Sequence, residues 1–128
     1  MRRIITAAVL SVACAGCLSS ETLEFDTVQL GRSLNPDNTI ANHATTFSPK
    51  DTIHVSVLTS SIGAGTIAVR WTFEGRVVGE PSKQVRYKGP GVTEFSLTSA
   101  AGFPAGNYKV EVFIDGQPVG DRAFRVEP

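Results

Sequence analysis

The chain has little cysteine, no net charge and no long hydrophobic run. Two Cys, one Met and one Trp occur among 128 residues, and 12 basic side chains balance 12 acidic ones. Two cysteines cannot make the several bridges of a disulfide-rich small scaffold. Balanced charge gives no electrostatic reason to expect nucleic acid as a partner. One domain is expected at this length, and 12 glycines with seven prolines favour many turns over a helical bundle.

The main apolar run lies at the amino terminus and is too short to cross a bilayer. Met1-Arg2-Arg3 is followed by about ten mostly apolar residues that end at Ala13. A permanent transmembrane helix needs roughly 20 such residues. We therefore predict that residues 1–16 are a signal peptide for general secretion.

The residues that follow the apolar run read Ala13-Cys14-Ala15-Gly16-Cys17. This sequence resembles the lipobox of bacterial lipoproteins, with Cys14 where that family usually has Leu. The resemblance implies cleavage before Cys17, diacylation of its sulfur and acylation of the new amino terminus, with palmitate among the acyl groups. Cleavage after Ala15 is the alternative, because Ala13 and Ala15 fit a small-x-small site. A redox Cys-x-x-Cys is disfavoured because cleavage would remove Cys14.

The lipobox resemblance also implies a location in the bacterial cell envelope. Leu18, rather than Asp, follows the cysteine, which in a Gram-negative cell implies the outer membrane, facing the periplasm. Residues 17–24 are predicted to be a tether, whose last seven residues reach at most about 25 Å. The membrane, through this lipid, is thus one expected partner.

Alternation of apolar and polar residues predicts an all-β domain over residues 25–128. On the best of the expected strands, Ile67, Val69, Trp71 and Phe73 share the face toward the core. Turn residues separate the strands, among them Asn35-Pro36-Asp37-Asn38 and Gly63-Ala64-Gly65. About seven short antiparallel strands in this length are typical of a β-sandwich. The expected strands are 25–33, 39–47, 51–59, 66–74, 77–87 with a break, 92–98, 107–115 and 119–126.

Two segments of the sequence resemble each other at an offset of 41 residues. Residues 73–80 and 114–121 both read apolar, acidic, Gly, two residues, Val, Gly, acidic. The pairs Glu74-Gly75 and Asp115-Gly116 suit tight hairpin turns, and the later Gly79 and Gly120 suit β-bulges. We predict two hairpins of the same chemistry in one sheet, each with its second strand at an edge.

Trp71, the segment Gly106-Asn107-Tyr108 and the closing hairpin at Asp115-Gly116 resemble an immunoglobulin- or fibronectin III-like domain. The similarity covers about residues 45–127 and extends to the last two strands of many secreted bacterial modules. The cysteine pair of that family is absent, and Val55 or Val57 with Val110 or Val112 is expected in its place. The resemblance implies a module that binds, spaces or stiffens rather than catalyses.

Residues that could carry catalysis or metal binding are sparse. His43 and His54 are the only histidines, and no Cys follows residue 17, so we expect no metal site and no cofactor. Asp37 or Asp51 could join a triad, but no Gly-x-Ser-x-Gly elbow presents a nucleophile. The turn at Asp37 has too few carboxylates for Ca²⁺. We therefore expect a protein that is not an enzyme.

Strand parity places one set of side chains together on the outer face of a sheet. Phe113 opposes the inward Val112 and Ile114, and a large outward apolar residue can anchor a partner. The candidate partner-binding residues on this face are Phe113, Arg70, Thr72, Lys109 and Glu111. A second candidate is the basic-aromatic stretch Arg86-Tyr87-Lys88, with Lys83 nearby, which could meet an acidic partner or lipid head groups.

These observations favour a lipid-anchored, non-catalytic envelope protein whose Ig-like module contacts another envelope protein. The alternatives are an envelope enzyme inhibitor and a polysaccharide-binding module. The second would normally expose more aromatic residues than two tyrosines and one inward tryptophan.

Overall fold

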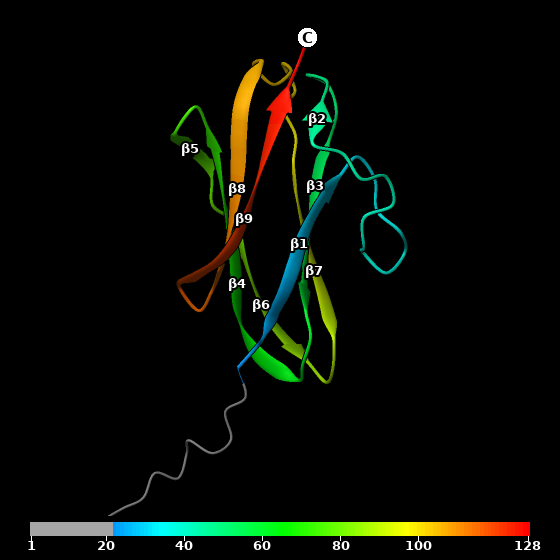
Figure 1. Cartoon of the computed structure of the whole chain (residues 1–128), viewed down its shortest axis with the longest axis vertical. Helices are drawn as coiled ribbons and strands as arrows, with labels where there is room; N and C mark the ends of the chain where they lie inside the picture. Colours follow the sequence, from blue (N-terminus) through cyan, green and yellow to red (C-terminus); the bar gives the residue numbers. More distant parts are fainter. Residues whose placement is uncertain (1–21) are drawn as a thin grey trace, which may run out of the picture.

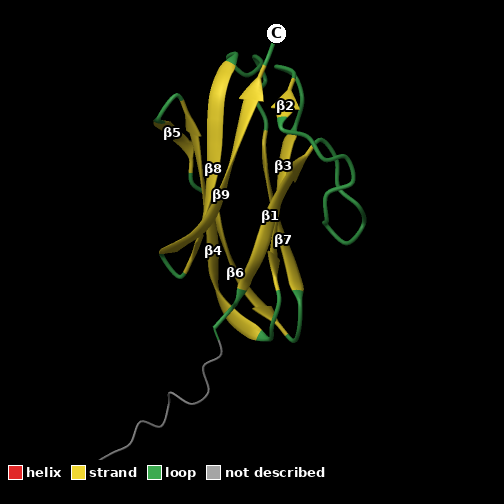
Figure 2. Cartoon of the chain, viewed as in Figure 1, coloured by secondary structure: helices red, strands yellow, loops and turns green. Residues whose placement is uncertain are grey.

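The computed structural model describes residues 22–128, which form two facing β-sheets (Figure 1). The predicted signal peptide and Cys17 lie outside the described residues. Strands and loops make up all of this part of the chain (Figure 2), and it has no helix long and apolar enough to cross a membrane. The nine strands are β1 (Phe25–Gly31), β2 (Thr46–Phe47), β3 (Ile53–Thr59), β4 (Gly63–Phe73), β5 (Arg76–Gly79), β6 (Ser82–Tyr87), β7 (Gly91–Leu97), β8 (Gly106–Ile114) and β9 (Gln117–Val126).

The two sheets confirm the predicted Ig-like β-sandwich, with nine strands rather than about seven. The smaller sheet has the order β1-β3-β7, and the larger has the order β2-β9-β8-β4-β5 with β6 also paired to β4. All pairs are antiparallel except β2 with β9. β5 and β6 pair with successive halves of β4, on the same side of that strand. The predicted break in residues 77–87 is the gap between them, after Gly79 and before Ser82.

The core lies between the sheets and is built from alternate residues of the facing strands. Trp71 is 0% exposed, as its parity with Ile67 and Val69 predicted. Its ring meets Phe124 of β9 edge to face, with centroids 6.1 Å apart. Valines fill the central layer in place of the Ig cysteines, all four of them fully buried: Val55, Val57, Val110 and Val112.

Both predicted hairpins are present in the larger sheet, but only β5 is at an edge as predicted, because β2 pairs with the end of β9. Glu74 and Gly75 have positive φ angles of 47° and 84°, and Asp115 and Gly116 have 50° and 84°. Positive φ at both central residues is the requirement of a type I′ hairpin turn. Each outgoing strand then carries one extra residue, before Gly79 in β5 and before Gly120 in β9, which confirms the predicted bulges.

Tyr108 fixes the start of β8 through a hydrogen bond back along the chain. Its hydroxyl donates to the carbonyl oxygen of Pro104 at 2.7 Å, the arrangement known as a tyrosine corner in Ig-like sandwiches. Burial raises the pKa of this phenol, and the charge of Glu74 adds to the shift. The segment Gly106-Asn107-Tyr108 thus begins β8, and its tyrosine makes this corner.

Two of the predicted local structures are wrong. Of the expected strand 39–47, only Thr46 and Phe47 form a strand. The residues before them loop over the outer face of the smaller sheet, where Ile40 is buried and Ser56 donates a hydrogen bond to the carbonyl of Asn38. Residues 63–65 are not a turn but the start of β4. Gly63 is needed there because a Cβ atom would lie 2.8 Å from the carbonyl oxygen of Thr22.

The first described residues already belong to the packed domain. Thr22 forms a parallel bridge with Ala64 of β4. Leu23 is 6% exposed and joins the hydrophobic core. The packed part of the chain therefore includes Thr22 and Leu23, which the sequence analysis had placed in the tether before Phe25.

Candidate functional site

The outer face of the larger sheet brings the five candidate partner-binding residues together. β4 and β8 pair so that Arg70 lies opposite Glu111 and Thr72 lies opposite Lys109. Phe113 lies opposite Ala68, one pair further along the same face. Side chains directly across an antiparallel pair are close enough to interact. The five residues thus form one continuous surface, which we call the outer face.

The charged side chains of the outer face pair mainly with one another. Arg70 places its Nε 3.0 Å from Oε2 of Glu80 and its Nη1 3.7 Å from Oε1 of Glu111. Lys109 Nζ lies 3.9 Å from Oε2 of the same Glu111. Each such exposed pair contributes about 0–1 kcal/mol to stability. Their main effect is therefore to hold the side chains in place on the face.

Phe113 points outward as predicted, but it is half-buried. The guanidinium of Arg70 lies over its ring, with Cζ 4.7 Å from the centroid. This is a cation–π distance, which is favourable even for exposed groups. A partner that uses Phe113 as an anchor would meet the Arg70 guanidinium first, so the ring is a covered rather than an open anchor.

Two large apolar residues that are about half exposed lie one strand further out, on β5. Val77 is 53% exposed and Val78 is 50% exposed, and both belong to β5, at the edge of the sheet. Val77 pairs with Thr72 and helps to line a shallow hollow of about 580 Å³. The other residues that line this hollow include Lys109, Glu111 and Ala123.

Sequence reasoning did not include these two valines among the site residues. The sequence predicted an edge strand over residues 77–87 with a break, whereas β5 has only four residues and leaves both valines exposed. Successive residues of a strand point to opposite faces, and the bulge at Val78 leaves this residue outside the ladder. No sequence signal marks their exposure, because it depends on the absence of a second strand beside β5 in residues 22–128.

The residues considered for catalysis or metal binding have structural roles. Asp37 Oδ1 accepts hydrogen bonds from the hydroxyl of Thr39 at 2.6 Å and from its backbone N–H at 3.0 Å. These bonds, the hydroxyl bond first, lower the pKa of the Asp37 carboxyl. Asp51 Oδ2 instead accepts from the N–H of Ser48 at 2.8 Å and from Arg32 at 3.2 Å. Both aspartates thus hold loops.

The two histidines lie on either side of Gly31. His43 bridges Gly31 from the loop, and His54 pairs with Gly31 from β3. Two strand spacings therefore separate the histidines, which is too far for a shared metal ion. In residues 22–128, no three His, Cys, Asp or Glu side chains come close enough together to hold one.

The basic-aromatic stretch lies on β6 of the larger sheet and on the turn that follows, and two of its side chains reach β7 of the smaller sheet. Tyr87 donates or accepts a hydrogen bond with Thr93 at 2.7 Å and donates to the carbonyl of Val92 at 2.9 Å. Lys83 Nζ lies 3.4 Å from Oε2 of Glu94. These two side chains thereby cover the free edge of β7. Arg86 and Lys88 remain exposed at the end of the stretch.

The aromatic side chains give little support to the polysaccharide alternative. Trp71 and Tyr108 are buried in the core. Tyr87 is half-buried, with its hydroxyl bonded to β7. A sugar ring would need an open aromatic face, and these three side chains instead pack in the core or against β7.

Comparison with known proteins identifies the fold and no family. No protein family and no curated protein sequence matches the chain. An immunoglobulin-like protein from Pseudomonas aeruginosa aligns over 85% of this chain and 99% of its own, with a TM-score of 0.59 and 13% identity. Part of a β-glucosidase from Listeria innocua aligns over 83% of this chain, with a TM-score of 0.54 and 16% identity.

A DNA glycosylase from Pseudomonas fluorescens aligns over 88% of this chain, with a TM-score of 0.51 and 10% identity. The chain spans 16% of the β-glucosidase and 32% of the DNA glycosylase. At these identities the comparisons show an immunoglobulin-like fold alone.

Proposed function

We propose that this chain is a lipid-anchored, non-catalytic protein of a bacterial envelope. Its Ig-like domain binds another envelope protein through the outer face of the larger sheet. The anchor rests on Ala15-Gly16-Cys17 and the signal core before it. The binding surface rests on one observation: β5 exposes two adjacent valines, and the first of them, Val77, also lines the hollow.

Exposed apolar residues on a monomer are informative when they cluster at a site that also offers polar groups. Val77 and Val78 lie at the unpaired edge of β5, and Thr72, Lys109 and Glu111 line the adjoining hollow. An apolar patch rimmed by polar residues marks many protein–protein interfaces. The paired charges around Arg70 offer a polar rim whose geometry is already fixed.

The surface is tested by replacing both valines with serine in the full chain. Val77→Ser together with Val78→Ser should abolish site-specific cross-linking to the partner in intact cells, because the change removes the two exposed apolar side chains on which the surface is proposed. Gln117→Ser is the control, because Gln117 is exposed at the start of β9, in the second hairpin and away from β5. Unchanged cross-linking by the double variant, at unchanged melting temperature, would contradict the proposed surface.

Phe113 gives a second test of the same face. Phe113→Ala should weaken partner binding with little change in melting temperature, because the ring is outside the core and lies on the outer face beneath the Arg70 guanidinium. A large loss of stability would mean that the ring supports the fold instead. Normal binding would limit the surface to β5 and the hollow.

The anchor is tested separately by metabolic labelling with a fatty acid. Wild-type protein should carry the acyl label, and Cys17→Ser should lose it while the domain still folds. An unlabelled wild-type protein would overturn the lipoprotein assignment and favour cleavage after Ala15.

A further inference from the structure

One end of the sandwich holds the start of the described chain together with two turns. Thr22 bridges Ala64, and the N–H of Ser60 donates to the carbonyl of Glu24 at 3.0 Å. The β3–β4 turn, residues 60–62, and the β6–β7 turn, residues 88–90, lie at this same end, because Thr59 pairs with Gly91 and Gly63 with Tyr87. We call this the near end; it is the lower end in Figure 1.

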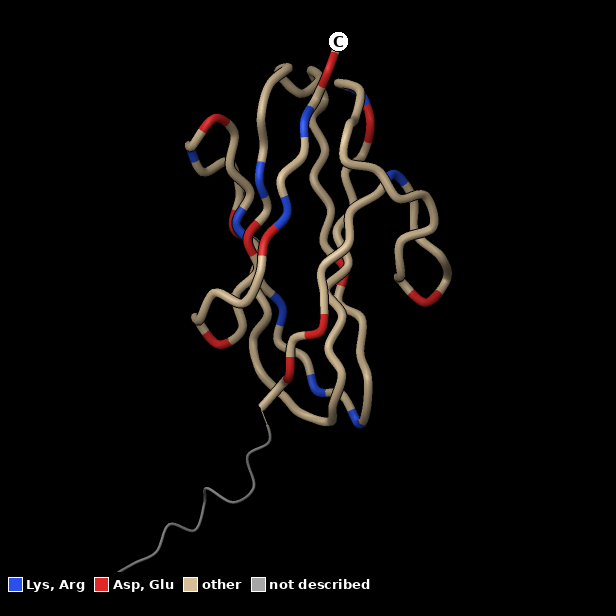
Figure 3. Tube along the Cα trace, in the orientation of Figure 1, with Lys and Arg blue, Asp and Glu red and all other residues tan. Residues whose placement is uncertain are grey.

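The near end exposes one large apolar side chain and two basic ones. Ile62 is 49% exposed at the tip of the β3–β4 turn. Arg86 and Lys88 are exposed on and after β6, and neither forms an ion pair with a carboxylate of residues 22–128. The Cα trace in Figure 3 shows basic positions at the lower tip of the molecule.

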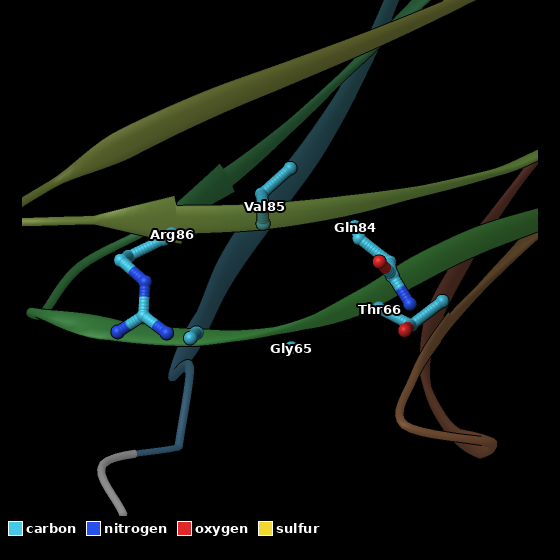
Figure 4. Close-up of a pocket in the computed structure, with 6 residues that line it drawn as sticks. Gly65, Thr66, Gln84, Val85 and Arg86 are labelled. Carbon is cyan, nitrogen blue, oxygen red and sulfur yellow. The ribbon is translucent and has the colours of Figure 1, made fainter.

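Arg86 stands beside the place where the chain enters the domain. Figure 4 shows its guanidinium extending across to the start of β4, and Arg86 pairs there with Ala64. It lines a shallow hollow of about 350 Å³ together with the side chains of Gln84 and Thr66. Guanidinium, amide and hydroxyl groups are all donors that suit phosphate oxygens.

The length of chain between the acylated cysteine and the domain limits where this end can be. Thr22 is five residues after Cys17, so the two lie at most about 18 Å apart when the chain is fully extended. β4 alone has 11 residues, which is about 36 Å of strand. An anchor at Cys17 therefore keeps the near end at the head groups while the opposite end can extend away from the bilayer.

We propose that the near end rests on the anionic bilayer that holds the anchor, with Ile62 at the head-group boundary and Arg86 and Lys88 against lipid phosphates. The proposal rests on the lipid anchor of the proposed function. Basic side chains near an anionic membrane surface each favour binding. Exposed Glu24 and Asp26 lie on the β1 side of the same end, so the contact is made by the β3–β4 and β6–β7 turns. This orientation turns the β4–β5 hairpin, with Val77, away from the bilayer.

The orientation is tested with the lipidated full chain in vesicles that contain phosphatidylglycerol and bromine-labelled acyl chains. Ile62→Trp should be quenched by bromine well beyond the wild type, whose Trp71 is 0% exposed. Val77→Trp is the matched control at the opposite end and should show no added quenching. Equal quenching of both variants, or stronger quenching at Val77, would overturn the proposal because the domain would then lie on its side.

The basic residues are tested by charge reversal in the Ile62→Trp background. Arg86→Glu with Lys88→Glu should lose most of the quenching, and vesicles of phosphatidylcholine alone should give the same loss. Lys50→Glu with Arg76→Glu makes the same change of net charge away from the near end and should leave the quenching intact. Equal effects of the two pairs would contradict a specific contact.

Cys17 acyl label, measured on the same samples, separates a failed anchor from a failed orientation. Protein rather than lipid adducts from a cross-linker at Ile62 would also overturn the proposal.

Discussion

The two hairpins of the larger sheet are nearly the same in chemistry and opposite in surroundings. In each, the acidic residue of the turn bonds the neighbouring strand twice. Glu74 N–H donates to the carbonyl of Asn107 at 2.9 Å, and its carboxylate accepts from the N–H of Asn107 at 2.9 Å. Asp115 makes the same two bonds to Thr66, at 2.8 and 2.9 Å.

A glycine makes room for the carboxylate in each case. A Cβ atom on Gly106 would lie 2.7 Å from Oε2 of Glu74, and one on Gly65 would lie 2.9 Å from Oδ2 of Asp115. The two sequence segments at an offset of 41 residues are therefore similar because they make the same hydrogen bonds. The turn after β4 bonds the start of β8, and the turn after β8 bonds the start of β4.

The outgoing strands differ because of what lies beside them. β9 is covered on its free side, where Arg122 donates to the carbonyl of Val28 at 2.8 Å and Phe25 packs against Gly120. Val119 accordingly packs against the core. β5 has no strand on its free side, and the equivalent Val78 is 50% exposed. Turn chemistry therefore determines a hairpin, while neighbouring segments determine whether its edge is available to a partner.

The largest expected effect removes the side chain that joins the two hairpins. Trp71 lies below Gly79 of the first and meets Phe124 of β9. Trp71→Ala should cost about 3–5 kcal/mol, as a large-to-small change in a core does. Denaturant unfolding measures this loss. A cost near that of a surface change, about 0.5 kcal/mol, would place the ring outside the core.

The bulge glycines separate the covered strand from the open one. A Cβ on Gly120 would lie 2.8 Å from the Phe25 ring, whereas one on Gly79 would meet Trp71 and Leu97 at ordinary distances of 3.5 and 3.9 Å. Gly120→Ala should cost about 1–3 kcal/mol through overpacking, and Gly79→Ala should stay within about 0.5 kcal/mol. Thermal unfolding of the two variants side by side checks this. Equal costs would mean that β5 is as confined as β9.

The turn carboxylates should behave alike, because their bonds are alike. Glu74→Ala and Asp115→Ala should each cost about 1 kcal/mol, the usual contribution of a hydrogen bond at an exposed site. Amide hydrogen exchange at Asn107 and Thr66 would show the local loss in each variant. Loss at only one of the two turns would break the equivalence of the hairpins.

The smallest expected effect compares the two bulge valines. Val78→Ser should leave stability within about 0.5 kcal/mol, because the side chain is half in solvent. Val119→Ser should cost more, about 1 kcal/mol, because part of its apolar surface is buried. The ranking is read from melting temperatures, and a reversed order would contradict the assignment of open and covered edges.

The sequence predicted what depends on local periodicity and turn chemistry. Alternation placed Trp71 in the core, and the Asp-Gly and Glu-Gly pairs placed both hairpins. The loop before β2 was not predictable in this way. Ile40 is buried because its own loop folds back over β3, where Ser56 bonds Asn38. Gly63 and Gly65 suggested a turn, but both serve close approaches, to Thr22 and to Asp115. These approaches are long-range and leave no periodic signal.

The sequence predicted which face the candidate residues share, but not all of the residues that the structure exposes beside them. Strand parity brought Arg70, Thr72, Lys109, Glu111 and Phe113 to one face. It could not show that Arg70 lies over Phe113, which depends on a rotamer, nor that β5 ends so early that Val77 and Val78 stay exposed. Exposure of an edge depends on the absence of a neighbouring strand, which only the three-dimensional arrangement reveals.

The central claim is that the β5 side of the outer face contacts another protein, whereas the second hairpin does not. Site-specific photo-cross-linking in intact cells tests it most directly, with the cross-linker placed at Val77 or at Gln117, an exposed residue of the second hairpin. The account predicts a discrete protein adduct from Val77 that Val78→Asp removes, and none of comparable yield from Gln117. Adducts of equal yield from both positions, or none from Val77 in acyl-labelled protein, would contradict it.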